Sequence, residues 1–64
     1  MIAKKLIRIL IDDYGMSKES IAGILGSSVR SVERWHAGRG TPLPVYRNRL
    51  QEMVDIEAAK GAKQ

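Results

Sequence analysis

The chain has 64 residues and no cysteine, so no disulfide can stabilise its fold and no thiolate can bind a metal. Its single histidine, His36, has no cysteine partner and only scattered carboxylates around it in the sequence. We therefore expect no metal site and no cofactor. A chain of this length is expected to form one domain, because single domains start near ~50 residues.

The sequence also lacks a long apolar run. No uncharged apolar stretch approaches the ~18 residues that a membrane span needs. Arg8 interrupts the one stretch near the N-terminus that would otherwise suggest a signal peptide. The apolar content of 44% and the charged content of 28% are ordinary for a soluble folded chain. These features predict a cytoplasmic protein with no membrane partner.

Groups that could perform catalysis are scarce as well. The sequence has no glycine-rich phosphate-binding motif, no nucleophile–base arrangement and no metal-binding triad. The neighbouring Asp12 and Asp13 would point about 100° apart on a helix, so they are not expected to act as an acid–base pair. The sequence therefore predicts that the protein is not an enzyme.

Basic charge is concentrated in one segment. The chain holds 11 lysines and arginines against 7 acidic residues, which gives a net charge of +4. The stretch from Arg30 to Arg49 contains five arginines and a single acid, Glu33, so it carries the whole excess. A guanidinium group is planar and forked, which suits phosphates and base edges. The segment is either a solvated basic face or a contact for nucleic acid.

Apolar residues recur with helical spacing between glycines, which predicts an all-α domain of four to five short helices. The first helix is expected at 2–14, because Gly15 can adopt the left-handed conformation that ends helices. The second is expected between Ser17, a good N-cap, and Gly26. Gly23 weakens this helix, and close contact with another helix is the one reason the sequence offers for it. The side chains expected inside are Ile2, Leu6, Ile9 and Leu10, with Ile7, Ile11 and Tyr14 beside them, and then Ile21, Ala22, Ile24 and Leu25.

A third helix is expected at 29–36, capped by Ser27 or Ser28 and ended before Gly38. On a helical wheel Val32 and Trp35 share the inner face. Trp35 is therefore expected to pack in the core rather than to stack on bases. The opposite face is formed by Val29, Arg30, Glu33 and Arg34. An exposed valine between two arginines is unusual for a face that only meets water.

The fourth helix is expected to begin with Thr41 as its cap and Pro42 in its first turn. Its inner stripe is predicted to be Leu43, Tyr46, Leu50, Met53 and Val54, while Val45, Arg49 and Ile56 lie on a different side. The domain is expected to span residues 1–59. Residues 60–64 are expected to form a flexible tail.

The second and third helices together, about 17–37, fit a helix-turn-helix unit. Ala22 is small where the helices cross, and Gly26 lies at the turn, where a left-handed conformation is needed. From Met16 to Gly38 the sequence resembles the Cro/phage-repressor family, also called the Xre family, of helix-turn-helix regulators. The matching residues are Ser17-Lys18, Ile21-Ala22, Leu25-Gly26, Ser31-Val32-Glu33, Trp35, Ala37-Gly38 and Pro42.

This resemblance implies a lambda-repressor-like domain that binds double-stranded DNA sequence-specifically as a transcriptional regulator. Such a protein would be a small dimeric repressor of its own or a neighbouring operon, of a phage or anti-CRISPR-associated type, in a prokaryotic or phage-infected host cell. The resemblance implies base reading by Ser28, Val29, Arg30 and Arg34, with Glu33 near the backbone or a cytosine edge. We expect phosphate contacts from Lys18, Ser27, Ser31, Arg39 and Arg47.

Some alternatives stay open at this point. Arg30 and Arg34 contact either guanine or phosphate, and Val29 either contacts a thymine methyl or is partly buried in the core. Structured RNA is a poorer partner than DNA, because the A-form major groove is deep and narrow. The alternative function is a protein-interaction module, such as an antitoxin or a DNA-packaging adapter, that uses the same helices.

One recognition helix spans only a few base pairs, so we expect a homodimer on an inverted-repeat operator with half-sites ~34 Å apart. The dimer surface is expected on the fourth helix, through Val45, Arg49 and Ile56. The alternative surface is the side of the first helix formed by Ile7, Ile11 and Tyr14. No small-molecule ligand is expected.

Overall fold

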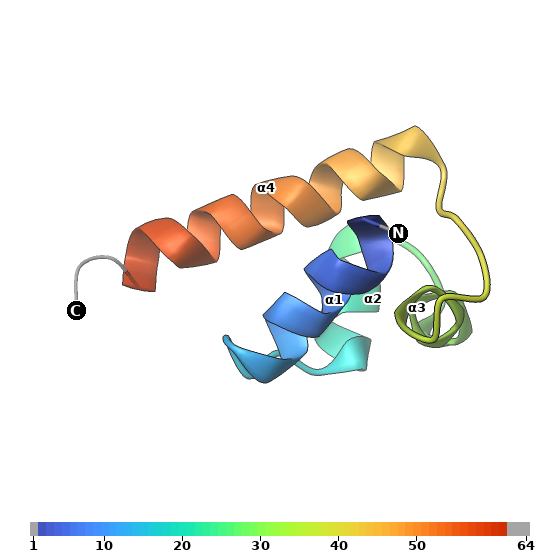
Figure 1. The fold of residues 1–64 in the computed structure, drawn as a ribbon, viewed down its shortest axis with the longest axis horizontal. Coiled ribbons are helices and arrows are strands. Elements are labelled where there is room, and N and C mark those ends of the chain that lie inside the picture. Colours follow the sequence, from blue (N-terminus) through green and yellow to red (C-terminus); the bar gives the residue numbers. More distant parts are fainter. Residues whose placement is uncertain (1, 62–64) are drawn as a thin grey trace.

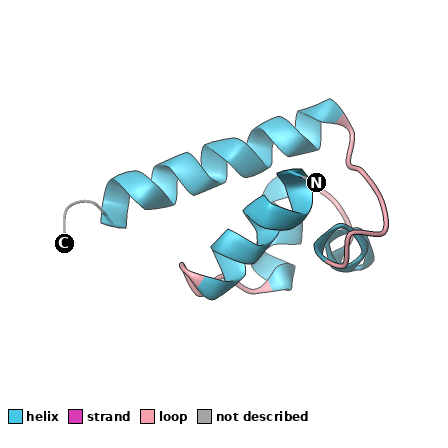
Figure 2. Ribbon diagram, viewed as in Figure 1, coloured by secondary structure: helices cyan, strands magenta, loops and turns pink. Residues whose placement is uncertain are grey.

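The fold is that of a computed structural model, in which residues 2–61 are described. Within that range the chain forms four helices, α1 (Ile2–Asp12), α2 (Lys18–Leu25), α3 (Val29–His36) and α4 (Pro44–Gly61) (Figure 1). Helices and loops account for all of the described residues, with no strand among them (Figure 2). The prediction of a small all-α domain is confirmed.

The buried face of α1 consists of Ala3, Leu6, Ile7 and Leu10, which follow the i, i+3, i+4, i+7 spacing of one helix side. Ile7 was expected beside the stripe but is fully buried, and Ile9 was expected within it but is only partly buried. The reason is that α1 is covered by both α3 and α4, which shifts the buried arc. The side chain of Ile2 lies outside the description.

The end of α1 is set by Gly15, as predicted, although the helix stops two residues earlier than 14. Gly15 has a φ of +68°, in the left-handed region that favours glycine. Its amide donates to the carbonyl of Ile11 at 3.1 Å, and the amide of Met16 donates to the carbonyl of Leu10 at 3.0 Å. These bonds satisfy carbonyls at the helix end and turn the chain toward α2.

The helix-turn-helix unit has the predicted boundaries and caps. The hydroxyl of Ser17 accepts from the amide of Ser20 at 3.1 Å, and the hydroxyl of Ser28 accepts from the amide of Ser31 at 3.1 Å. Gly26 lies between α2 and α3 with a φ of +76°. The four side chains expected to hold the pair together, Ile21, Leu25, Val32 and Trp35, are all buried.

The start of α4 differs from the prediction. The helix begins at Pro44, and the carbonyl of Leu43 accepts from the amides of Tyr46 at 3.0 Å and Arg47 at 3.1 Å. Leu43 therefore takes the capping position expected for Thr41, and Pro42, which was expected in the first turn, lies before the helix. The physical reason is that a residue before proline is driven out of the helical conformation, which keeps Leu43 outside the helix. Leu43 is 64% exposed and does not join the inner stripe.

The end of α4 also differs, because Lys60 and Gly61 belong to the helix rather than to a flexible tail. Residues 57–60 contain two alanines, which favour helix, and Lys60 Nζ lies 3.4 Å from a carboxylate oxygen of Glu57. The last helix thus continues past residue 59. Residues 62–64 of the expected tail lie outside the described residues.

The core is formed by side chains of all four helices, with α1 and α2 each packed against both α3 and α4. In Figure 1, α4 crosses over α1, and α3 lies beside α1 at the end where the chain begins. The buried side chains are Ala3, Leu6, Ile7, Leu10, Ile21, Ala22, Leu25, Val32, Trp35, Leu50 and Met53. Each large one contributes about 1.5–3 kcal/mol by leaving water. Tyr46 and Val54 of the predicted α4 stripe are partly buried against this core.

Two features of α2 contradict the sequence prediction. Ile24 is 53% exposed, although it was expected inside with Ile21, Ala22 and Leu25. It lies about 100° away from the middle of the face that those three residues form, so α1 and α3 do not cover it. Gly23 makes no close helix contact, because a Cβ built there would meet no atom within 4 Å.

Candidate nucleic-acid interface

The outer face of α3 carries exposed charges over a buried inner face. Val32 is 0% exposed and Trp35 is 9% exposed, whereas Arg30, Glu33 and Arg34 are all exposed. The predicted division of α3 into an inner face and an outer polar face is therefore confirmed. Burial of Val32 and Trp35 fixes the rotation of α3 about its own axis, and this rotation decides where the two guanidinium groups point.

Val29 was expected on the outer face of α3, either in contact with a thymine methyl or partly buried in the core. Its side chain is partly buried and packs against the core. The position at the first residue of α3, next to the turn from α2, brings the short side chain within reach of the core. Of the two alternatives for Val29, partial burial is therefore the one that the structure supports.

The serines at the start of α3 hold the helix end. Ser28 accepts from the amide of Ser31 and also donates to the Ser31 hydroxyl at 3.0 Å, while Ser27 donates to the Ser28 carbonyl at 3.4 Å. Ser28 is exposed, and Ser27 and Ser31 are half-buried. All three hydroxyls thus have local partners, and contact with a base or phosphate would have to compete with these bonds or add to them.

The loop after α3 lies close to Arg34. A Cβ built on Gly40 would lie 3.5 Å from Arg34 Nη2 and 3.9 Å from Trp35 Cδ1, so the guanidinium group extends over the loop backbone. The amide of Arg39 donates to the Arg34 carbonyl at 2.9 Å. Arg39 itself is exposed. The structure thus brings two of the predicted residues, Arg34 and Arg39, to the C-terminal end of α3.

Lys4 is a basic residue at this end of α3 that the sequence did not indicate. A Cβ built on Gly38 would lie 3.4 Å from Lys4 Cδ and 3.8 Å from its Nζ. The ammonium group thus lies near the C-terminal turn of α3, where the helix dipole favours a cation. No sequence signal could have found it, because Lys4 is on α1 and Gly38 is in the loop after α3, far apart in the sequence.

The remaining predicted basic residues lie on other elements. Lys18 is the half-buried first residue of α2, and Arg47 is exposed in the first turn of α4. Arg49 turns toward α2 instead, where its Nη1 donates to the carbonyl of Ile24 at 3.5 Å. The five arginines of the basic segment are therefore divided between two surfaces.

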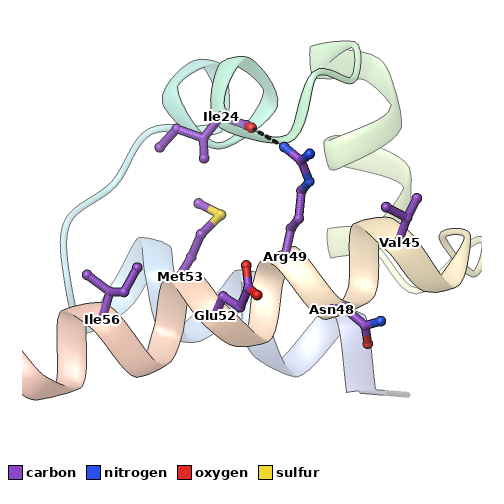
Figure 3. A pocket seen from close by; sticks show the side chains of 7 residues that line it. All are labelled: Ile24, Val45, Asn48, Arg49, Glu52, Met53 and Ile56. Atoms are coloured by element: carbon purple, nitrogen blue, oxygen red, sulfur yellow. Dashed lines mark hydrogen bonds between the residues drawn. The ribbon is translucent and has the colours of Figure 1, made fainter.

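The second surface is a groove between α2 and α4, with a volume of about 420 Å³ (Figure 3). All three residues predicted for a dimer surface, Val45, Arg49 and Ile56, line it together with Ile24, Asn48, Glu52 and Met53. Val45 is 52% exposed and Ile56 is 54% exposed. Sequence reasoning missed Glu52, which the spacing of three from Arg49 and four from Ile56 would have placed on the same side of α4.

The alternative dimer surface on α1 is not available as predicted. Ile7 is 0% exposed and belongs to the core, and Ile11 and Tyr14 are partly buried against it. A side chain that is fully enclosed within its own chain cannot contact a second copy.

The described residues form no cluster of three or more histidine, aspartate or glutamate side chains that could hold a metal ion. None of the helices in residues 2–61 is both long and apolar enough to span a bilayer. Asp12 and Asp13 are exposed at the end of α1.

Comparison of the chain with known protein families, with curated proteins and with solved structures gives no match.

Proposed function

We propose that this protein binds double-stranded DNA sequence-specifically and regulates transcription, with α3 as the recognition helix. The observation that carries the proposal is the orientation of α3, in which buried Val32 and Trp35 direct exposed Arg30 and Arg34 away from the core. A bidentate arginine is the commonest specific contact to a guanine edge in the major groove.

The dimensions of α3 suit this role. An α-helix with its side chains is about 10–12 Å in diameter, which matches the width of the major groove of B-DNA, about 12 Å. The serine-capped N-terminus of α3 leaves the helix end exposed, and helix N-termini favour phosphate groups. In this proposal Arg30, Arg34 and Glu33 meet base edges, while Lys18, Arg39 and Arg47 neutralise phosphates and set the register.

The regulatory outcome we propose is repression of the protein's own or a neighbouring operon. A small domain that covers a promoter sequence blocks transcription by occupancy, which requires no further chemistry. This part of the proposal also draws on the resemblance of residues 16–38 to Cro/Xre regulators.

Selection from a random pool of duplex DNA tests the proposal most directly. We expect enrichment of a short common sequence, and binding to it that weakens with salt by a log–log slope of about −0.9 for each phosphate contacted. The variant Arg30→Ala/Arg34→Ala should lose the preference for that sequence. Arg8→Ala is the control, because it removes an exposed arginine from α1 without touching α3.

Two results would contradict the proposal. The first is a pool that shows no enriched sequence. The second is a double variant that selects the same sequence as the unaltered chain with the same affinity.

A further inference from the structure

Exposed apolar side chains gather in the groove between α2 and α4. Three of the four exposed large apolar residues of the described chain, Ile24, Val45 and Ile56, line it. A second hollow of about 220 Å³ shares Ile24, Met53 and Ile56 with the first and extends it toward the end of α4. Apolar surface gathered in this way marks an interaction site.

The residues that α4 contributes to this groove form a symmetric pattern. They are Val45, Asn48, Arg49, Glu52, Met53 and Ile56. These positions have the spacing of one helix face and are paired about the midpoint between Leu50 and Gln51, so that Val45 is matched with Ile56, Asn48 with Met53, and Arg49 with Glu52. Met53 is only 8% exposed, so the matches that a partner can contact are Val45 with Ile56 and Arg49 with Glu52. Two antiparallel copies of α4 related by a two-fold axis through that midpoint would place each residue opposite its match.

The charges in this pattern are complementary. Arg49 and Glu52 are exposed, and Glu52 has no ion-pair or hydrogen-bond partner among residues 2–61. The one bond of Arg49 in that range is the long one, 3.5 Å, to the Ile24 carbonyl (Figure 3). An antiparallel pair would set Arg49 of each copy against the partner's Glu52, giving two ion pairs beside the axis and an apolar contact between Val45 and the partner's Ile56 at each end.

We propose that this groove binds a second copy of the same chain, with the two α4 helices antiparallel and Arg49 opposite the partner's Glu52. A symmetric array in which opposite charges and apolar residues match themselves suits a second copy better than an unrelated protein. The proposal goes beyond DNA binding, because none of these residues lies on α3, and it is independent of whether the chain binds DNA.

Charge reversal tests the register by measurement of self-association in the absence of DNA. We expect sedimentation equilibrium of the full chain to show a dimer. Arg49→Glu and Glu52→Arg should each weaken it at least about tenfold, because each places two like-charged pairs beside the axis. The double variant Arg49→Glu/Glu52→Arg should restore the dissociation constant to within about threefold, since the opposite charges face each other again.

Arg47→Glu is the matched control, because it makes the same charge change on α4 at a position about 200° around the helix from Arg49. It should leave dimerisation unchanged. All three altered positions are exposed, so thermal unfolding followed by circular dichroism should show that each variant keeps the fold.

Three results would overturn the proposal. A chain that stays monomeric throughout the concentration range would assign the groove to a different protein. Single variants that dimerise as well as the unaltered chain, or a double variant that remains as weak as the single ones, would exclude the proposed pairing.

Cysteine cross-linking gives a second measurement that does not depend on charge. The chain has no cysteine of its own, so introduced thiols report only the designed contact. A mixture of Val45→Cys and Ile56→Cys chains should form a mixed disulfide on oxidation. Val45→Cys alone should not, because its two thiols would be about 16 Å apart along the axis. Equal cross-linking of the mixture and of Val45→Cys alone would contradict the antiparallel register.

Discussion

The rings of Trp35 and Tyr46 pack against each other with centroids 5.6 Å apart and planes tilted by 36°. Trp35 is near the end of α3 and Tyr46 is in the first turn of α4, so this contact joins α3 to the helix that lines the groove. The loop between them also contacts the indole, since a Cβ on Gly40 would lie 3.9 Å from Trp35 Cδ1.

Removal of the Tyr46 ring should therefore destabilise the domain. We expect Tyr46→Ala to lower the free energy of unfolding by about 1–3 kcal/mol, because it removes both apolar burial and the ring contact. Tyr46→Phe keeps the ring and should change the free energy of unfolding by less than ~0.5 kcal/mol. Urea unfolding monitored by circular dichroism measures both. Equal stability of the two variants would show that the ring contact contributes little.

Gly23, inside α2, and Gly26, at its C-cap, should respond in opposite directions to substitution by alanine. Gly23→Ala should stabilise the protein by about 0.5–1 kcal/mol, because Gly23 is helical and has open space around its Cβ position. Gly26→Ala should destabilise it by about 1–2 kcal/mol, because a φ of +76° is strained for any residue with a Cβ. Thermal unfolding of the two variants measures both changes in stability. Midpoint shifts of the same sign would contradict the different backbone roles given to Gly23 and Gly26.

The cap of α3 should depend on Ser28 and not on its neighbour. Ser28→Ala removes the acceptor for the Ser31 amide and should cost about 1 kcal/mol of stability. Ser27→Ala should stay within ~0.5 kcal/mol, because the Ser27 hydroxyl makes only a 3.4 Å bond to the Ser28 carbonyl. Chemical denaturation of the two variants gives the comparison. A larger loss at Ser27 would place the cap one residue earlier.

Arg34 and Arg39 should differ in their effects on DNA binding, although the structure places them at the same end of α3. We expect Arg34→Ala to cost about 1–3 kcal/mol and to relax the preference at one base pair. Arg39→Ala should weaken all sequences alike and reduce the salt slope by about 1. Fluorescence anisotropy with the selected duplex and single-base variants of it measures both. Identical effects of the two substitutions would contradict the assignment of base contact to Arg34 and phosphate contact to Arg39.

Most local features of the fold could be predicted from the sequence, because each depends on residues within one or two helical turns. Ser17 and Ser28 cap helices through amides three positions away, and Gly26 takes the left-handed turn that its neighbours require. The start of α4 was missed for an equally local reason, since Pro44 excludes Leu43 from the helix.

The candidate site was predictable only in part. The spacing of Val32 and Trp35 within α3 was enough to place Arg30 and Arg34 outside, because a helix has a fixed angular period. The burial of Val29 was not predictable, since it depends on how deeply the first turn of α3 enters the core. Lys4 was missed because its contact with Gly38 joins two helices that are distant in the chain.

The sequence by itself determined the helices, their caps and the side of α3 that faces the core, because these follow from local backbone geometry and helical periodicity. Only the tertiary structure decided which apolar residues of each helix are buried in the core and which remain exposed. Ile7 is enclosed because α3 and α4 both cover α1, whereas Ile24 remains exposed because α4 leaves a groove beside α2. The same packing turns Arg49 toward α2 and away from the other arginines, a result of helix positions that no local pattern encodes.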